Sequence, residues 1–426
     1  MDGRYGKLVK SHMNCTGPLA AGVKALPDGV QAFAHTQAMW RFLANRRVTP
    51  KELSVPLLAA AREAVSADGG EYVLSIADWS RVNYGGHTSK QDRLQMTHAT
   101  DVGYELQSSV LVSAENGAPL CVPVQNLVTA QGVWCSHADT INPRVPSHLD
   151  ELSERMTWLE QQAFGPRLVH VIDREADSVA HLRRWTRNEQ LWLVRVKGCS
   201  TVRYGEGSMR IDAVAGQLSF TAERQVLCKG RPVQQWIASA PVVLTRTAKP
   251  KKADADGRRQ PPVAGEPLAA RLVVSRLFDD AGQQVAEWFL LTSVPETVSA
   301  SRLALWYYFR WQIESFFKLL KQAGHHLEQW EQESGGATFK RLLIATQACV
   351  LVWRLARQET EEADAARRFL VRLSGRQMKA SHPVTPSALL AGAFMLFALL
   401  DSLDHYSIPE LRAFANSILL ADGGGG

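Results

Sequence analysis

The chain has 426 residues, of which 46% are hydrophobic and 21% charged, values ordinary for a soluble globular protein of two to four domains. No apolar run reaches the roughly 18 residues of a membrane span, and the first residues lack a signal-peptide core, which argues against membrane and secreted proteins. The six scattered cysteines form no close pair, which argues against a zinc cluster and favours a reducing cytoplasm. The net charge of +6 is uneven, because residues 1–65 carry +5 and residues 195–287 carry +6, a distribution that fits a polyanion gripped at two places but also a merely solubilising excess.

Two helices are predicted near the N-terminus. The first begins about residue 31, and the second follows Pro50 over Leu53–Val65. Because Arg41, Arg46 and Arg47 lie on or just after the first helix, we expect this short basic region to contact phosphates.

Three strands are predicted next, from runs in which β-branched and apolar residues dominate. The first, Glu71–Asp78, ends at Asp78. The second and third, Tyr104–Ser113 and Pro119–Val128, are joined at Asn116-Gly117, which is a strong hairpin signal.

A helix over Ser147–Phe164 leads to a fourth strand within Arg167–Asp177. The continuous apolar run of this strand is typical of burial on both faces, and Asp173 lies where the strand ends. A helix over Ser178–Trp185 and a strand over Leu191–Lys197 follow. The order β-β-β-α-β-α-β, with carboxylates at the ends of the first and fourth strands, is the layout of a ribonuclease-H-like core.

Residues 200–287 interrupt this order. Short strands are predicted at Gln234–Ala240, Val242–Arg246 and Ala270–Phe278, with a polar, proline-rich loop over Ala248–Pro267. We interpret this region as an inserted β subdomain. Glu287–Ser293 returns to the core, and after residue 339 the chain is predicted to be helical.

The fold class expected is therefore α/β, with a ribonuclease-H-like catalytic core of mixed sheet and helices, an inserted β subdomain, and helical N- and C-terminal regions. The predicted parts are a basic helical region (1–65), the core (66–199 and 288–340), the insert (200–287) and a helical region (341–426).

The segment Trp306–Lys321 carries the strongest pattern in the chain. At about 100° per residue, one face of a single helix would carry Tyr307, Arg310, Glu314 and Lys321, whereas the opposite face is apolar. One face would pack into a core, and the other would present a carboxylate beside a guanidinium, an ammonium and a phenol. Alternatively, Arg310 and Glu314 form an i,i+4 pair on a solvated face.

Asp78, Asp173 and Glu314 come from separate elements and could together hold two divalent cations. Magnesium and manganese prefer oxygen ligands, and two such ions about 4 Å apart stabilise both the attacking and the leaving oxygen of a phosphoryl transfer. Asp78 is predicted to bridge both ions, Asp173 to bind one and Glu314 the other.

Three alternatives stay open on this evidence. Asp78 and Asp173 could each cap a local turn or helix. Glu175 or Asp177 could be the ligand in place of Asp173, which is preferred because it lies at the strand edge. A glycosidase-like carboxylate pair is the third alternative, although the flanking arginine and lysine favour a phosphate substrate.

The spacing Tyr-x2-Arg-x3-Glu-x6-Lys of Tyr307, Arg310, Glu314 and Lys321 resembles the Tyr-Arg-Glu-Lys signature of DDE transposases of the insertion-sequence-four family. The aspartates fit this resemblance as well. The segment Asp173–Asp177 is similar to the one around the family's second catalytic aspartate.

Asp78 matches the family's first catalytic aspartate, and Leu290–Glu296, with Trp288 just before it, also fits. The likeness covers about residues 37–339. It implies a bacterial cut-and-paste DNA transposase, similar to those of composite transposons, with two Mg²⁺ ions per site for which Mn²⁺ can substitute.

The resemblance also implies partners and roles. A homodimer, formed through the C-terminal helices, would pair transposon ends, cut them through a hairpin and join the 3′-hydroxyls to target DNA, in the nucleoid-associated cytoplasm and without a membrane. Tyr307, Arg310 and Lys321 would hold phosphates, Trp288 would accompany a flipped base, and Arg195 and Lys197 would line the DNA.

The N-terminus departs from the family, since only Asp2, Arg4 and Leu8 faintly match its first helical region. Two other functions therefore stay open. One is a non-catalytic regulator that dimerises with a full-length transposase but holds no DNA end. The other is a stand-alone ribonuclease-H-like nuclease.

Overall fold

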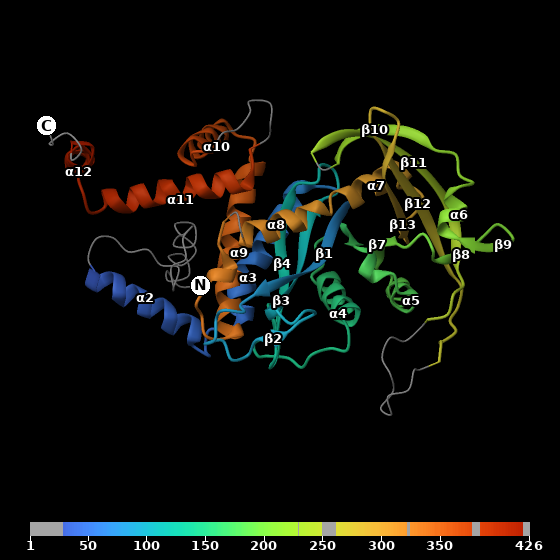
Figure 1. Ribbon diagram of the computed structural model, residues 1–426, viewed down its shortest axis with the longest axis horizontal. Coiled ribbons are helices and arrows are strands. Elements are labelled where there is room, and N and C mark those ends of the chain that lie inside the picture. The colour runs from blue at the N-terminus through green and yellow to red at the C-terminus, as the bar shows by residue number, and fades with distance from the viewer. Residues whose placement is uncertain (1–28, 229, 249–260, 322–323, 377–383, 421–426) are drawn as a thin grey trace.

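The computed structural model describes residues 29–228, 230–248, 261–321, 324–376 and 384–420 (Figure 1). The protein has a mixed α/β fold built on a 13-stranded sheet, which confirms the expected class. The strand order is β5-β4-β3-β1-β6-β7-β13-β12-β11-β8-β9, with β2 paired to β3 and β10 to β11. The predicted residues Asp2, Arg4 and Leu8 lie outside the described part of the chain.

The strands are β1 (Tyr72–Asn83), β2 (Leu94–Gln95), β3 (Val102–Ser113), β4 (Pro119–Thr129), β5 (Gly132–Cys135), β6 (Arg167–Ile172), β7 (Leu191–Val196), β8 (Thr201–Tyr204), β9 (Gly207–Arg210), β10 (Thr221–Cys228), β11 (Arg231–Leu244), β12 (Leu268–Phe278) and β13 (Gln284–Thr292).

The helices are α2 (Gly29–Ala44), α3 (Pro50–Asp68), α4 (His148–Gln161), α5 (Val179–Arg187), α6 (Ile211–Ala215), α7 (Ala300–Tyr308), α8 (Trp311–Lys321), α9 (Gly335–Arg357), α10 (Glu361–Leu373), α11 (Pro386–Leu403) and α12 (Ile408–Leu420), with short 3-10 turns η1 (Arg174–Ala176) and η2 (Leu327–Gln329).

Strands β1 and β6 set the centre of the sheet. They run parallel, and their last paired residues are Ala77 and Ile172. The prediction that the first strand ends at Asp78 was wrong, because β1 continues to Asn83 through antiparallel pairing with β3. Asp78 and Asp173 are nevertheless the residues that follow directly where the parallel pairing stops. The sheet therefore brings these two carboxylates to neighbouring positions.

The buried side chains form two large clusters against the sheet. One joins side chains of α3, α8 and α9 to strands β1, β3 and β4. The other joins α4, α5 and α6 to β6, β7, β11 and β12. Helix α3 starts with a capping box formed by Thr49 and Glu52, and its buried face belongs to the first of these clusters. Helix α2, which precedes α3, packs more peripherally, through Met39 and Leu43 against Ile344.

Strands β8 to β12 extend the same sheet outward from β13. The two strands predicted at Gln234–Ala240 and Val242–Arg246 are one strand, β11, which passes through Pro241. A proline lacks the N–H that a sheet partner needs, so it is rare inside a paired strand. It is tolerated because one edge of β11 pairs with β10 up to Ile237 and with β8 only at Val243, which leaves that edge unpaired at Pro241.

Helix α11 extends away from the body of the protein (Figure 1). Its first half is buried, whereas its second half exposes Met395, Leu399, Leu400 and Leu403. From the sequence, no apolar run is expected to be long enough for a membrane span. The helix has 18 residues, and in the part of the chain that the structure describes it alone is long and apolar enough to cross a membrane, with 28% of it buried.

Candidate active site

The chain breaks its helix inside the Tyr-Arg-Glu-Lys segment. A single helix over Trp306–Lys321 was predicted, but α7 ends at Tyr308 and α8 begins at Trp311. At the break the backbone bonds shorten to three-residue spacing, from Arg310 N–H to Tyr307 and from Ile313 N–H to Arg310. The ring of Phe309 lies against Gly117 of the β3–β4 turn, where an added Cβ would come within 2.4 Å of it.

The break points Arg310 into a cluster of carboxylates. Its Nη1 donates to Asp78 Oδ2 at 2.9 Å, and its Nη2 donates to Glu314 Oε1 at 2.6 Å. The guanidinium is 14% exposed, whereas the carboxylates are 23% and 38% exposed. One arginine therefore joins a strand residue to a helix residue more than 200 positions away in the chain. The predicted i,i+4 pair exists, but it is part of a larger cluster.

Asp173 completes the cluster from the loop after β6. Its Oδ1 accepts hydrogen bonds from the Arg174 N–H at 2.6 Å and the Tyr307 hydroxyl at 3.1 Å. Arg195 Nη1 lies 3.9 Å from the same oxygen. The alternative that Asp173 caps the turn after it is thus correct, since it is the N-cap of η1. Capping occupies one of its oxygens, and the other has no hydrogen bond among the contacts described.

The neighbouring acids have different surroundings. Asp177 is 7% exposed, and it accepts from Ser200 Oγ and the Lys197 N–H and pairs with Arg246. It holds η1 to the strands beside it. Glu175 is 68% exposed and faces His148. Of the three acids in this segment, only Asp173 contacts the Tyr307 hydroxyl.

Burial and the neighbouring charges shift the pKa values of Asp78 and Asp173 in opposite directions. Burial raises the pKa of Asp78, and the nearby Asp173 and Glu314 add to this more weakly, against the lowering effect of Arg310. Burial would also raise the pKa of Asp173, but the Arg174 N–H, Arg310 and the Tyr307 hydroxyl together hold it below its usual value. Asp173 is therefore the more readily ionised of the two aspartates.

Lys321 and Trp288 flank the cluster. The Lys321 ammonium donates to the Arg81 carbonyl and lies 3.3 Å from Glu328, which also accepts the Asn83 N–H. The ring of Trp288 packs against that of Tyr307, with centroids 5.8 Å apart. Glu328 was not predicted as part of the site, because it lies beyond the end of α8 and only the folded chain brings it to Lys321.

The other predicted DNA contacts lie apart from these residues. Lys197 is exposed, and its backbone N–H binds Asp177. Arg41, Arg46 and Arg47 are exposed on and after α2, whose buried side chains pack with Ile344 of α9. The structure does not bring these three arginines to the carboxylate cluster.

The carboxylate cluster has the donor chemistry of a metal site, although its oxygens are not arranged around an ion. In the described ranges no group of three or more His, Cys, Asp and Glu side chains is arranged to hold a metal ion. The donor chemistry nevertheless fits magnesium or manganese, because three partly exposed carboxylates meet here and Asp78 is affected by its like-charged neighbours. Arg310 now binds the oxygens that such an ion would use.

Comparison with protein-family models and with curated proteins found no match for this chain. What the protein does must therefore follow from the chemistry of this cluster and of the surfaces around it.

Proposed function

We propose that the protein is a DDE transposase of the insertion-sequence-four family, which cleaves transposon ends by metal-assisted phosphoryl transfer and joins the 3′-hydroxyls to target DNA. One observation carries the proposal. Asp78, Asp173 and Glu314, separated by up to 236 positions in the chain, meet around Arg310, and Tyr307 of the same signature binds Asp173.

The topology supports a ribonuclease-H-like core. In the run β4-β3-β1-β6-β7, the first three strands pair antiparallel and the next two join in parallel. This is the β-β-β-α-β-α-β order expected for such a core. Residues 200–287 would then be an insert between β7 and β13, whose strands continue the core sheet through β12.

In this proposal Asp78, Asp173 and Glu314 hold two Mg²⁺ or Mn²⁺ ions, which would activate a water and stabilise the leaving oxygen. Tyr307 and Arg195 hold the Asp173 carboxylate in place. Arg310 and Lys321 supply positive charge for the phosphates beside the scissile bond. Trp288, packed on Tyr307, offers an aromatic face to an unpaired base.

The partners proposed are transposon-end DNA, target DNA and a second copy of the chain. Arg195 and Lys197 would line the DNA near the cluster, and Arg41, Arg46 and Arg47 would contact phosphates further away. The exposed apolar side chains of α11 and α12 support dimerisation through the C-terminal helices. The location proposed is the bacterial cytoplasm, at the nucleoid.

The direct test is incubation of the protein with the terminal DNA that flanks its gene, in the presence of Mg²⁺. We expect nicked ends, then hairpins, then joining to a second duplex. The same reaction in a chelator, and with Asp173→Asn, is the control. Full cleavage in the chelator would rule out the metal mechanism.

A second candidate is a regulator that dimerises but does not hold a DNA end. It is favoured by the peripheral packing of α2, which carries Arg41 and whose described buried side chains, Met39 and Leu43, pack in a small cluster with Ile344. A competition gel shift at two salt concentrations decides between the two. A transposase should prefer its terminal repeat over random duplex by on the order of 10³, whereas equal affinity would favour the regulator.

The helices after residue 340 argue against a third candidate, a stand-alone nuclease. Such an enzyme has no use for an extended, apolar C-terminal arm. Cleavage of arbitrary duplex, without dependence on terminal sequence, would favour it.

A further inference from the structure

His148 begins helix α4, and its ring stacks on Trp79. The ring centroids are 5.2 Å apart, and the planes are inclined by 22°. Trp79 directly follows Asp78 on β1. Because successive side chains of a strand point to opposite faces, Trp79 and His148 lie on the face of the sheet away from Asp78. His148 is therefore close to the site without being part of it.

Both ring nitrogens of His148 face carboxylates. Nε2 lies 3.0 Å from Glu105 Oε2, on β3, and Nδ1 lies 3.9 Å from Glu175 Oε2, in the turn η1. A neutral imidazole carries one N–H and one lone pair, so it can donate to only one of them. An imidazolium carries two N–H groups and can attract both carboxylates at once.

The charges around the ring favour its protonated form. The hydrogen bond with Glu105 raises the pKa of His148 against the lowering effect of burial, and Glu105, Glu175 and Glu151 add to this through their charge. Burial would raise the pKa of Glu105, but His148, Gln107 and Arg144 hold it below its usual value. The charges of Glu105, Glu175 and Glu151 thus act together on a half-exposed imidazole.

We propose that His148, as an imidazolium, is a positioning residue that ties the turn after Asp173 to β3, the strand paired with the one that carries Asp78. This inference rests on the proposed function only in assigning those two aspartates to catalysis. The turn is fixed at its far end by Asp177 and at its start by the Asp173 cap. Glu175 lies between these two points, and the ion pair described for its carboxylate is the one with His148.

Loss of the proton reverses one of these contacts. If Nε2 keeps its N–H toward Glu105, the lone pair of Nδ1 then faces the Glu175 carboxylate, and the attraction becomes repulsion. A base whose folded pKa is raised contributes fully below its unfolded value, near 6.5, and loses the contribution as pH rises through the folded value. The tie is therefore closed below about pH 6.5, and it opens as the pH rises through the raised pKa of His148.

The test does not need DNA. Hydrogen exchange of the Ala176 and Ser178 amides, which bind the Asp173 and Ala176 carbonyls, reports whether the turn is held. It is measured at pH 6 and pH 9, corrected for intrinsic exchange, in wild type and His148→Gln. We expect the substitution to speed exchange about 10-fold at pH 6 and to have little effect at pH 9.

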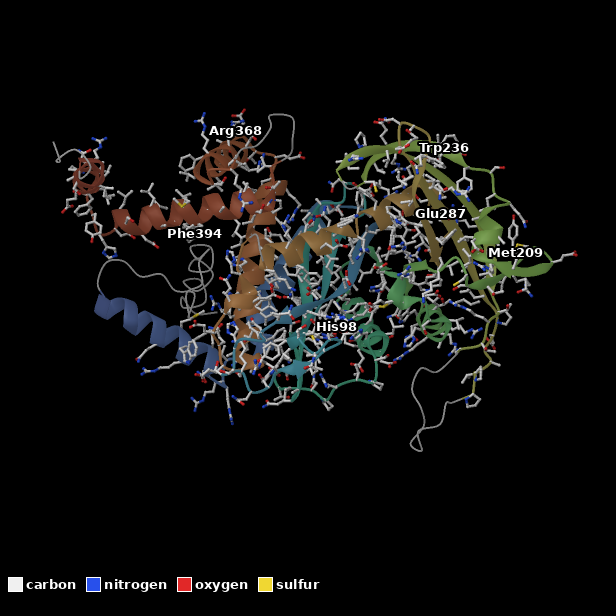
Figure 2. All side chains as sticks on the ribbon, viewed as in Figure 1. His98, Met209, Trp236, Glu287, Arg368 and Phe394 are labelled. Atoms are coloured by element: carbon white, nitrogen blue, oxygen red, sulfur yellow. The ribbon has the colours of Figure 1, made fainter. Side chains whose placement is uncertain are left out.

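His98→Gln is the matched control, because His98 is exposed on the loop between β2 and β3 (Figure 2). It should change neither value. The His148 ring should also titrate above an ordinary histidine by NMR, and Glu175→Gln should lower its pKa. Equal effects of His148→Gln at both pH values would assign it a merely structural role and overturn the proposal, as would a titration that ignores Glu175.

Cleavage supplies a second readout. The ratio of wild-type to His148→Gln nicking should be about 10-fold at pH 6.5 and fall towards one at pH 9, because misplacing a catalytic group by a fraction of an ångström has effects of this order. A ratio that does not depend on pH would contradict the proposal. If neither protein cleaves DNA, the proposed function fails, but the exchange and titration results still decide the role of His148.

Discussion

Two arginines of this protein bind carboxylates in contrasting ways. Arg155 on α4 pairs with Glu151, with contacts of 2.9 and 3.1 Å, and its third nitrogen donates to Ser109. The exposed fractions of the two charged side chains are 0% and 5%. Arg310 instead joins Asp78 to Glu314, and a third acid, Asp173, lies nearby. The side chains of these three acids remain 23% to 38% exposed.

The two clusters differ in the ratio of cations to carboxylates and in their exposure to solvent. Around Arg155 one cation matches one carboxylate, Asn126 donates to the same acid, and the group is closed to solvent. Around Arg310 three carboxylates share one close cation and the more distant Arg195. A balanced, closed pair has only a structural role, whereas an unbalanced and accessible cluster can accept further positive charge.

The largest effect is expected from Glu314→Gln, which removes negative charge from the unbalanced cluster. Nicking of terminal DNA should fall by about 10⁴-fold, because ligands of one catalytic unit act together. Circular dichroism and the melting temperature should be nearly unchanged. Glu206→Gln, in the exposed β8–β9 turn, is the control. Retention of most of the wild-type rate would remove Glu314 from the site.

The next largest effect is expected from Arg155→Met, which removes the cation of the buried Arg155–Glu151 pair. It leaves the Glu151 charge buried without its partner, so the free energy of unfolding should fall by about 3–5 kcal/mol in denaturant titration. Adding Glu151→Leu should recover much of this loss. Arg310→Met should cost much less, because its acids reach water. Similar losses for the two arginines would undo the contrast drawn between the two clusters.

The stabilisation of the protein by metal ions should depend on the Arg310 cluster and not on the Arg155 pair, with a smaller change in free energy than the substitutions above. Mg²⁺ or Mn²⁺ at 100 times its dissociation constant should stabilise the wild type by about 2.7 kcal/mol in a thermal shift, and Asp78→Asn should lose this response. Arg155→Met should keep it, after allowance for its lower stability. Ca²⁺ should bind but support little cleavage, because its looser coordination positions water poorly. A full response from Asp78→Asn would place the ions elsewhere.

The smallest effect concerns the aromatic contact beside the open cluster. Trp288→Ala should raise the free-energy barrier to hairpin formation or opening by about 1–3 kcal/mol, the contribution of one base stacked on an aromatic ring. The first nick should change less. Because Trp288 also packs on Tyr307, a core role would instead lower the melting temperature and slow every step equally. Single-turnover kinetics of each step separates the two outcomes.

The sequence predicted the meeting of Asp78, Asp173 and Glu314 because the first two follow apolar, strand-like runs and the third lies on the polar face of a helix. In the structure β1 continues past Asp78, but its parallel pairing with β6 stops just before the two aspartates. It did not predict the break before Trp311, because the apolar spacing of Ile313, Phe316 and Leu320 continues the period of the residues before it. Periodicity reports which face is buried, not whether the backbone turns between two helices.

Contacts between distant segments were also beyond reach. The pairing of Lys321 with Glu328, and the approach of His148 to Glu175, depend on how α8 and α4 pack against β1 and η1. The passage of β11 through Pro241 depends on which edge of that strand has a partner. Neither kind of information is present in a local run of residues.

The position of Arg310 has a consequence for how ligands would influence one another. Its guanidinium uses Asp78 and Glu314 oxygens that a divalent ion would also use, so the two positive groups exchange for one another. An ion that displaces the guanidinium leaves it free to bind a phosphate. Metal and nucleic acid would then strengthen each other's binding reciprocally, without sharing an atom. A dissociation constant for terminal DNA that is the same with and without Ca²⁺, at matched ionic strength, would show that no such exchange occurs. Where it does occur, Arg310 holds the Asp78 and Glu314 oxygens in place until a divalent ion takes them over.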